Sequence, residues 1–178
     1  YGTTVVGTVS SDSITFGTPV VFSSANATGI SSTYNPVNSK VVISYADNNN
    51  SSYGTAAVGT VSGDSISFGT PVEFYRGSTS STSTTYDPVN NKVVIAYKDG
   101  ANSSYGTAVM GTVTGDSITF GTPELFNSAN LTNLLSTYDP ANSKVVIVYR
   151  DQANSAQGTA VVGTVSGDSI SFGSPKVF

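Results

Sequence analysis

Residues 53–74 read YGTAAVGTVSGDSISFGTPVEF, and this stretch decides the fold because the chain contains it, with small changes, four times. The related copies begin at Tyr1, Tyr105 and Gln157, so each copy starts 52 residues after the one before. A fixed period of this length is typical of an array in which each unit buries its apolar face against its neighbours. The sequence therefore predicts one array over residues 1–178, with repeat units 1–52, 53–104 and 105–156 and a partial unit 157–178.

The composition narrows the classes of fold and partner. Hydrophobic residues make up 38% of the chain and occur as short β-branched runs, which favours a layered β core. Charged residues are only 10%, the formal net charge is -4, and the seven Lys and Arg are scattered singly, so we expect no nucleic-acid partner. There is no apolar run long enough to cross a bilayer, so we expect no membrane insertion. A surface rich in Ser, Thr, Asn and Gly favours an extracellular, cell-surface or virion location.

Turn chemistry divides each unit into four strands. In the first full unit we expect strands at 30–34, 40–45, 54–62 and 65–74. The first two are joined by Asn35-Pro36-Val37-Asn38-Ser39 and the last two by Gly63-Asp64, and both segments are typical of hairpin turns. The third strand follows the second through a polar loop.

The residues of each strand predict its place in the sheet. The first strand is small and hydroxylated, as expected where neighbouring units converge. The second is apolar on both faces, which requires cover on both sides and places it mid-sheet. The fourth carries a proline in every copy, which is tolerated only at an edge: Pro19, Pro71, Pro123 and Pro175. Isoleucine and phenylalanine alternate on one face of this strand and should pack against the next unit: Ile14, Phe16, Ile66, Phe68, Ile118, Phe120, Ile170 and Phe172.

A repeated four-stranded antiparallel sheet, small inside and polar at its rim, predicts an all-β fold of β-propeller blades, about three and a half per chain. The order of strands and the hairpin TYDPVNNKVVIAYKD at 85–99 resemble the kelch and sialidase-like propeller families, although the kelch double glycine, the Asp-box and the WD dipeptide are missing. The units also resemble the tandem repeats of surface and tail-fibre-like proteins of marine bacteria and phages, and that resemblance implies a surface location. A solenoid or a stacked sandwich is the alternative array.

The chain begins with only the third and fourth strands of a unit, residues 1–22, and then has three complete units. Three and a half blades do not close a ring of the roughly 4–8 blades usual for propellers. We therefore expect either self-association or continuation in a longer repeat chain.

The residue types present disfavour an enzyme. With neither histidine nor cysteine, the Ser-His-Asp and Cys-His arrangements and the usual zinc sites are excluded, and we expect no cofactor. Turn aspartates are assigned to bonds with backbone amides of their own turns: Asp12, Asp64, Asp87, Asp116, Asp139 and Asp168. Asp47, Asp99 and Asp151 open the loop after the second strand, where they either cap that loop or form part of a weak calcium site.

Differences between the copies fall in two loops. The loop after the fourth strand reads SSANATGI at 23–30, YRGSTSST at 75–82 and NSANLTNL at 127–134, and the loop after the second strand also varies. In a propeller both loops lie on one side, which we call the loop face. Within it, Tyr75 and Arg76 combine an aromatic ring with a planar donor, so they are candidate contacts for a sugar or a protein.

Three functions are compatible with these features. The first is a non-enzymatic structural or adhesive module of an extracellular, cell-surface or phage-fibre protein, which binds partners through the loop face. The second is a lectin-like, glycan-binding propeller. The third, a glycoside hydrolase or lyase, is disfavoured because it needs two carboxyls about 5–10 Å apart, and no convergent acid pair is evident.

Overall fold

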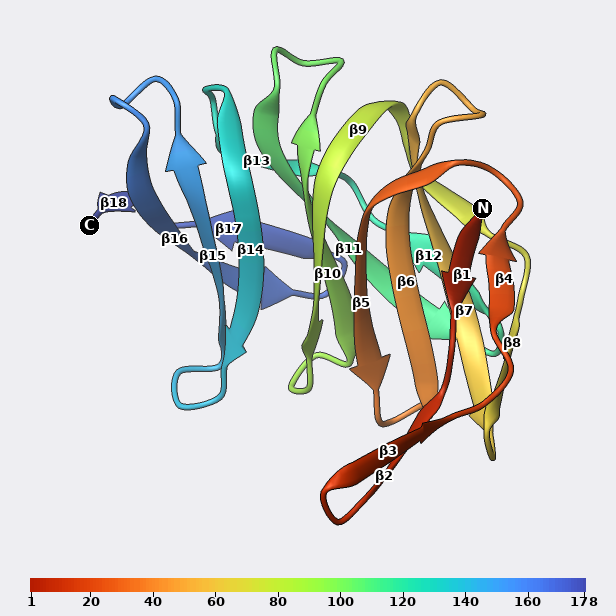
Figure 1. Cartoon of the computed structure of the whole chain (residues 1–178). Helices are drawn as coiled ribbons and strands as arrows, with labels where there is room; N and C mark the ends of the chain where they lie inside the picture. Colours follow the sequence, from red (N-terminus) through yellow and green to blue (C-terminus); the bar gives the residue numbers. More distant parts are fainter.

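The structure is a computed structural model that describes all 178 residues, and it consists of antiparallel β-strands and the turns between them (Figure 1). The prediction of an all-β fold is confirmed. No helix with the length and apolarity needed to span a membrane is present.

The strands form a half-sheet followed by three sheets that match the repeat units. The half-sheet contains β1 (Gly2–Thr4), β2 (Gly7–Ser10), β3 (Ser13–Phe16) and β4 (Val20–Ser23). The first sheet contains β5 (Ala27–Asn35), β6 (Lys40–Asp47), β7 (Tyr53–Ser62), β8 (Ser65–Phe68) and the start of β9 (Val72–Asp87). The second sheet contains the end of β9, β10 (Lys92–Asp99), β11 (Tyr105–Thr114), β12 (Ser117–Phe120) and β13 (Glu124–Asn127). The third contains β14 (Leu131–Asp139), β15 (Lys144–Asp151), β16 (Gln157–Ser166), β17 (Ser169–Phe172) and β18 (Lys176–Val177).

Strands pair in chain order within each sheet, as predicted. In the third sheet the order is β14-β15-β16-β17, with β18 also on β16, so the second strand lies mid-sheet and the fourth lies at the edge. The predicted fourth strand is, however, divided between two strands. The segment Gly69-Thr70-Pro71 separates β8 from β9, because proline has no N–H to donate to β7 and the ladder is interrupted there.

The segment 75–82, predicted to be a loop, lies inside the sixteen-residue strand β9. The first part of β9 pairs with β7 (Gly54 opposite Tyr75), and its second part pairs with β10 (Asp99 opposite Thr79). This strand therefore passes from one sheet to the next and joins them in a nine-stranded ladder. Pairing first with β7 and then with β10 supplies the hydrogen bonds that make an extended path favourable for this Ser- and Thr-rich segment.

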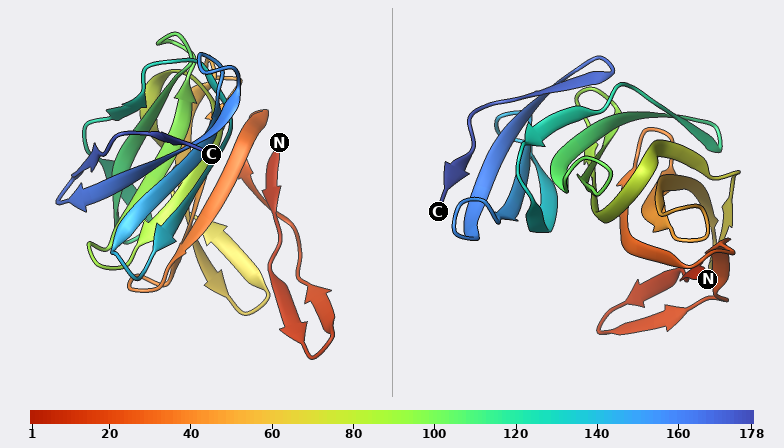
Figure 2. Two further views of the ribbon diagram at one scale, coloured as in Figure 1. Left: turned by 90° about the vertical axis from the view of Figure 1, so that its left-hand side faces the viewer. Right: turned by 90° about the horizontal axis from the view of Figure 1, so that it is seen from above.

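Successive sheets pack face to face. Between the first and second sheets, buried Val42, Ala56, Val58 and Phe74 meet Val93, Ile95, Tyr97, Val109 and Ile118. Between the second and third, Val94, Ala96, Ala108, Met110 and Phe126 meet Val145, Ile147, Tyr149, Val161 and Ile170. Seen from above, the sheets follow one another along an arc with the termini at its two ends, and no sheet is closed (Figure 2).

The alternating Ile and Phe of the fourth strand behave as predicted in the three complete sheets. Ile66, Ile118 and Ile170 are buried, and Phe68, Phe120 and Phe172 are half-buried against the cores. In the half-sheet the prediction is wrong for Ile14 and Phe16, which are exposed. No other sheet of the structure packs on this face.

The first strands of neighbouring sheets are linked through their hydroxyl groups. The backbone N–H of Thr84 donates to Ser31 Oγ at 2.9 Å, and the backbone N–H of Ser136 donates to Ser83 Oγ at 2.8 Å. These small side chains let β5, β9 and β14 lie side by side, which agrees with the prediction that units converge at the first strand.

Candidate functional site

The loop after the second strand and the segment that follows the fourth strand lie at the same end of the sheets, at the top of Figure 1. Backbone bonds connect them: Asn48 N donates to Asn26 O at 3.0 Å, Gly100 N to Ser78 O at 2.8 Å, and Gln152 N to Asn130 O at 3.0 Å. The loop face is therefore one connected surface in each unit.

The loop after the second strand keeps one backbone shape although its sequence varies. Each copy ends on two consecutive residues with positive φ: Ser51 and Ser52, Ser103 and Ser104, and Ser155 and Ala156, all between 51° and 62°. Left-handed conformations at non-glycine residues are uncommon, so three recurrences indicate a shape imposed by the frame. What changes between copies is the set of side chains that this shape presents.

The aspartates Asp47, Asp99 and Asp151 hold this shape. Asp47 Oδ1 accepts the N–H of Asn49 at 3.0 Å, and Asp151 Oδ1 accepts the N–H of Ala153 at 3.0 Å. Asp99 is buried and accepts two N–H groups, from Ala101 at 3.1 Å and Asn102 at 3.0 Å. Each carboxylate thus caps its own loop. No group of three or more acidic side chains that could hold a metal ion is present.

Tyr75 is a packing residue in part. Its ring lies 5.3 Å from that of Tyr97, with the planes inclined by 37°, and the side chain is half-buried under Gly77. Burial, together with a smaller contribution from the neighbouring Asp99 carboxylate, raises the pKa of the Tyr75 phenol to about 12. One edge of Tyr75 remains at the loop face, but the ring is not a free contact surface.

Arg76 lies next to Tyr75 and points outward, with 82% of its side chain exposed. Its Nε donates to Glu73 Oε2 at 2.8 Å, and Glu73 Oε1 accepts from Asn50 Nδ2 at 2.7 Å. Asn50, Glu73 and Arg76 form what we call the exposed polar cluster. The cluster connects β9 with the loop between β6 and β7, and it brings guanidinium, carboxylate and amide groups together.

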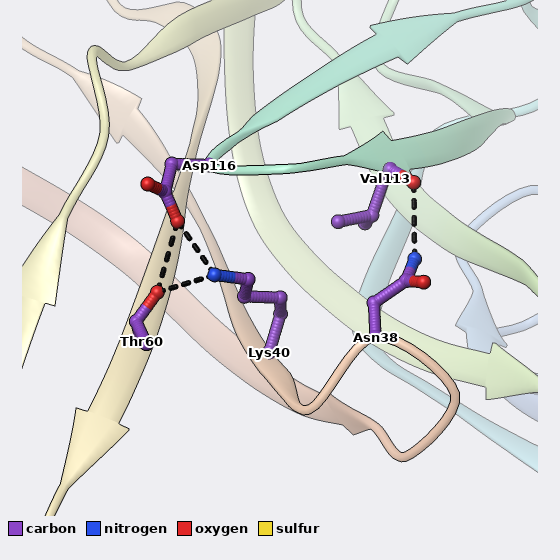
Figure 3. A network of polar contacts seen from close by, with 5 residues as sticks. All are labelled: Asn38, Lys40, Thr60, Val113 and Asp116. Carbon is purple, nitrogen blue, oxygen red and sulfur yellow. Dashed lines mark hydrogen bonds and ion pairs between the residues drawn. The ribbon is translucent and has the colours of Figure 1, made fainter.

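A second polar arrangement, which sequence reasoning missed, lies between the sheets (Figure 3). Lys40 Nζ lies 2.6 Å from Asp116 Oδ1 and donates to Thr60, and Thr60 Oγ1 donates to the same carboxylate oxygen at 2.9 Å. Lys92, Thr112 and Asp168 repeat this arrangement at the next junction, with Lys92 2.5 Å from Asp168. We call each such set a junction triad. Asn38 Nδ2 adds a bond to Val113 O at 3.0 Å beside the first triad.

Contacts between the sheets correct the assignment of three turn aspartates. Asp64, Asp116 and Asp168 bind side chains of the preceding sheet rather than amides of their own turns, and Asp12 makes no hydrogen bond. Asp87 and Asp139 do cap their own turns, accepting from the N–H groups of Val89 and Ala141 as predicted. The missed signal was recurrence, since Lys40, Lys92 and Lys144 are spaced by one period.

No family model matches the chain, and no curated protein sequence matches it either. No pocket is present on the surface.

Proposed function

We propose that this chain is a non-enzymatic structural or adhesive repeat module of an extracellular, cell-surface or virion protein, and that it binds partners through its loop face. The observation that carries the proposal is the loop after the second strand. Three copies share one backbone shape, including two consecutive positive φ angles, and differ in the side chains presented. A fixed frame with variable exposed side chains suits recognition, because binding residues are commonly placed on loops held by a rigid scaffold.

We further propose that the sheets are blades of a β-propeller or of a larger propeller-like assembly. Supporting this are the pairing of four strands in chain order, the face-to-face packing of successive sheets, and the contact between first strands through small hydroxylated residues. A solenoid would continue one ladder from unit to unit, as β9 does between the first and second sheets; the second and third sheets are separate ladders packed face to face, and this junction favours blades.

A lectin-like function is the second candidate, and the exposed polar cluster favours it. Arg76, Glu73 and Asn50 offer donors and acceptors of the kind that bind sugar hydroxyls. The cluster has no equivalent in the second or third sheet, because Leu125 and Val177 take the position of Glu73. The lectin proposal therefore predicts one main sugar site per chain.

The test uses the labelled chain on a printed glycan array and on whole bacterial cells. The double variant Asn50→Ala, Arg76→Ala removes two exposed members of the cluster, and Val89→Ser is the matched control at the opposite end of the sheets. We expect cell binding to fall in the double variant and to persist in the control. Array signals lost in the same variant would support the lectin function. Binding that is unaffected by the double variant, or equally reduced in the control, would contradict binding through this cluster.

A further inference from the structure

The outer face of the third sheet is apolar and uncovered. It presents Val146, Ala160, Val162 and Phe178, of which Val162 is 46% and Phe178 is 79% exposed. These residues follow Val42, Ala56, Val58 and Phe74 by two periods, and those four are buried in the core between the first and second sheets. The protein itself therefore shows what covers this face, namely the inward face of a following repeat unit.

The opposite end of the array carries the matching surface. Val9, Ile14 and Phe16 of the half-sheet are 72%, 50% and 64% exposed. Their counterparts two periods later, Val113, Ile118 and Phe120, pack against the first sheet across the first junction. The outer face of the third sheet and the exposed face of the half-sheet therefore correspond to the two sides of the junction between the first and second sheets.

Charge complementarity agrees with this match. In the third sheet Lys144 Nζ donates to Thr164 Oγ1 at 2.9 Å, which is a junction triad without its aspartate. In the half-sheet, Asp12 occupies the position of Asp116 and Asp168 and makes no ion pair. Each end therefore holds the part of the triad that the other lacks.

Gly173 provides independent evidence that a turn docks on the outer face of the third sheet. A Cβ on Gly69 would lie 1.9 Å from the Asp116 carbonyl oxygen, and a Cβ on Gly121 would lie 2.2 Å from that of Asp168, so glycine is required for the turn of the next sheet to approach. Gly173 has the equivalent position in the third sheet, yet its nearest neighbour would be Val162 O at 3.8 Å. The space next to Gly173, which the turn of the next sheet fills at Gly69 and Gly121, is therefore open.

We propose that the half-sheet of a second copy of this chain docks on the outer face of the third sheet and repeats the internal junction. Ile14 and Phe16 of that copy cover Val162 and Phe178, its Asp12 completes the triad with Lys144 and Thr164, and the carbonyl of Asp12 lies over Gly173. A contact between two different ends of the molecule is heterologous, so it produces closed rings or open chains of copies. This inference is independent of the function proposed for the loop face.

The residue of the third sheet that corresponds to Ser83 also favours a half-sheet as the occupant. Where Ser83 accepts the backbone N–H of Ser136 from the next sheet, the third sheet has Leu135, which is 64% exposed and has no acceptor in its side chain. A half-sheet has no first strand, so it has no N–H to place at that position. An occupant with a complete set of four strands would lose this hydrogen bond.

The principal test is Gly173→Ala, measured by sedimentation velocity of the 178-residue chain over a range of concentrations, with circular dichroism as the check of folding. The wild-type chain should associate. The variant should remain folded as a monomer, because its new methyl group meets open space, but it should associate at least about tenfold more weakly because the methyl group would collide with the docking turn. The contrasting variant Gly121→Ala should lower thermal stability, since the same collision then lies inside the chain.

Charge exchange provides the second test and is independent of the first. Asp12→Lys and Lys144→Asp should each weaken association, by more than about tenfold, through like-charge contact, whereas the double variant should recover it because the pair is restored with reversed sign. Glu124→Lys and Lys98→Asp change the net charge equally at positions outside both end faces and should associate like wild type.

A wild-type chain that stays monomeric at the highest concentration would overturn the proposal. Association that is unchanged in Gly173→Ala, or that the double charge exchange fails to recover, would also overturn it, because the copies would then meet through another surface.

Discussion

Lys92 Nζ lies 2.5 Å from a carboxylate oxygen of Asp168, a residue 76 positions later in the sequence and in the next sheet. Only 14% of the lysine side chain is exposed, whereas the aspartate side chain is largely exposed. The same relationship joins Lys40 to Asp116. Because lysine is costly to bury without a partner, these pairs fix how one sheet is placed against the next.

We predict that acid weakens these junctions. Hydrogen bonds from Lys40 and Lys92 are the main cause that lowers the pKa of Asp116 and Asp168 below the ordinary value of 3.8. A carboxyl group whose pKa is lower in the folded state stabilises the fold above its unfolded pKa, and this contribution is lost as the pH falls through the folded pKa. The thermal midpoint should therefore fall as the pH is lowered from 5 through about 4 and below.

The variant that checks this cause is Lys40→Met, Lys92→Met, which keeps the apolar stem of each side chain and removes its charge. Its thermal midpoint should depend less on pH in the acid range than that of wild type. Asp139 is an internal reference, because the pKa of this carboxyl is lowered mainly by a hydrogen bond from Asn142 of its own turn and is untouched by the substitutions. An unchanged acid dependence in the variant would show that the lysines do not set these carboxyl pKa values.

The repeat offers a matched pair of core substitutions. Ile118 is 1% exposed, whereas Ile14, two periods earlier, is 50% exposed. Ile118→Ala should lower the free energy of unfolding by about 2–5 kcal/mol, because it leaves a cavity between the first and second sheets. Ile14→Ala should change it by less than about 1 kcal/mol in the monomer. Chemical denaturation of both variants at low concentration provides the comparison, and equal losses would mean that the half-sheet is covered in solution.

The amino-acid sequence predicted most of the frame, because the frame depends on local chemistry repeated at one period. Asn-Pro and Asp-Pro segments define the hairpin after the first strand, Gly63 and its equivalents adopt the positive φ of the other hairpin, and proline places the fourth strand at the edge. These features need only a few neighbouring residues.

The features that the sequence did not predict depend on contacts between residues that are far apart in the chain. The segment 75–82 has the composition of a loop, but its first part pairs with β7 and its second part with β10, which makes it a strand. Likewise Tyr75 was expected at the surface, and the ring of Tyr97 holds it half-buried. The junction triads join residues 56 and 76 positions apart, which only the recurrence of Lys, Thr and Asp in each copy indicates.

The hydroxyl contacts between first strands allow a test of how the sheets are held together. Ser83 Oγ accepts the backbone N–H of Ser136 at 2.8 Å and lies 2.9 Å from the Ser136 hydroxyl. Ser83→Ala should lower the free energy of unfolding by about 1–3 kcal/mol, because the Ser136 N–H is left without its acceptor. Ser80→Ala on the same strand is the control, since Ser80 is exposed and should be neutral. A neutral Ser83→Ala would mean that water replaces the lost acceptor.

Tyr97 gives the last prediction, because its hydroxyl oxygen is buried and has no hydrogen-bond partner. Its ring is packed between Phe74 and Tyr75, with ring centroids 5.3 Å away in each case. Tyr97→Phe keeps this packing and removes a polar atom that has lost its water, so the variant should be as stable as wild type or more stable by up to about 1 kcal/mol. Tyr149→Phe, at the equivalent position with a similarly unpartnered hydroxyl, should behave in the same way.

The same substitution should also change the response to alkali. Burial is the main cause that raises the pKa of the Tyr97 phenol above the ordinary value of 10.0, and it raises that of Tyr149 to about 12. A phenol whose pKa is raised in the folded state favours the fold while it is neutral, and this contribution is lost as the pH rises above the unfolded value of about 10. The free energy of unfolding should therefore fall above pH 10 in wild type and fall less steeply in Tyr97→Phe. If the variant is destabilised at pH 7, or if its alkaline slope equals that of wild type, the hydroxyl of Tyr97 has a partner and is not the buried, unpaired group described above.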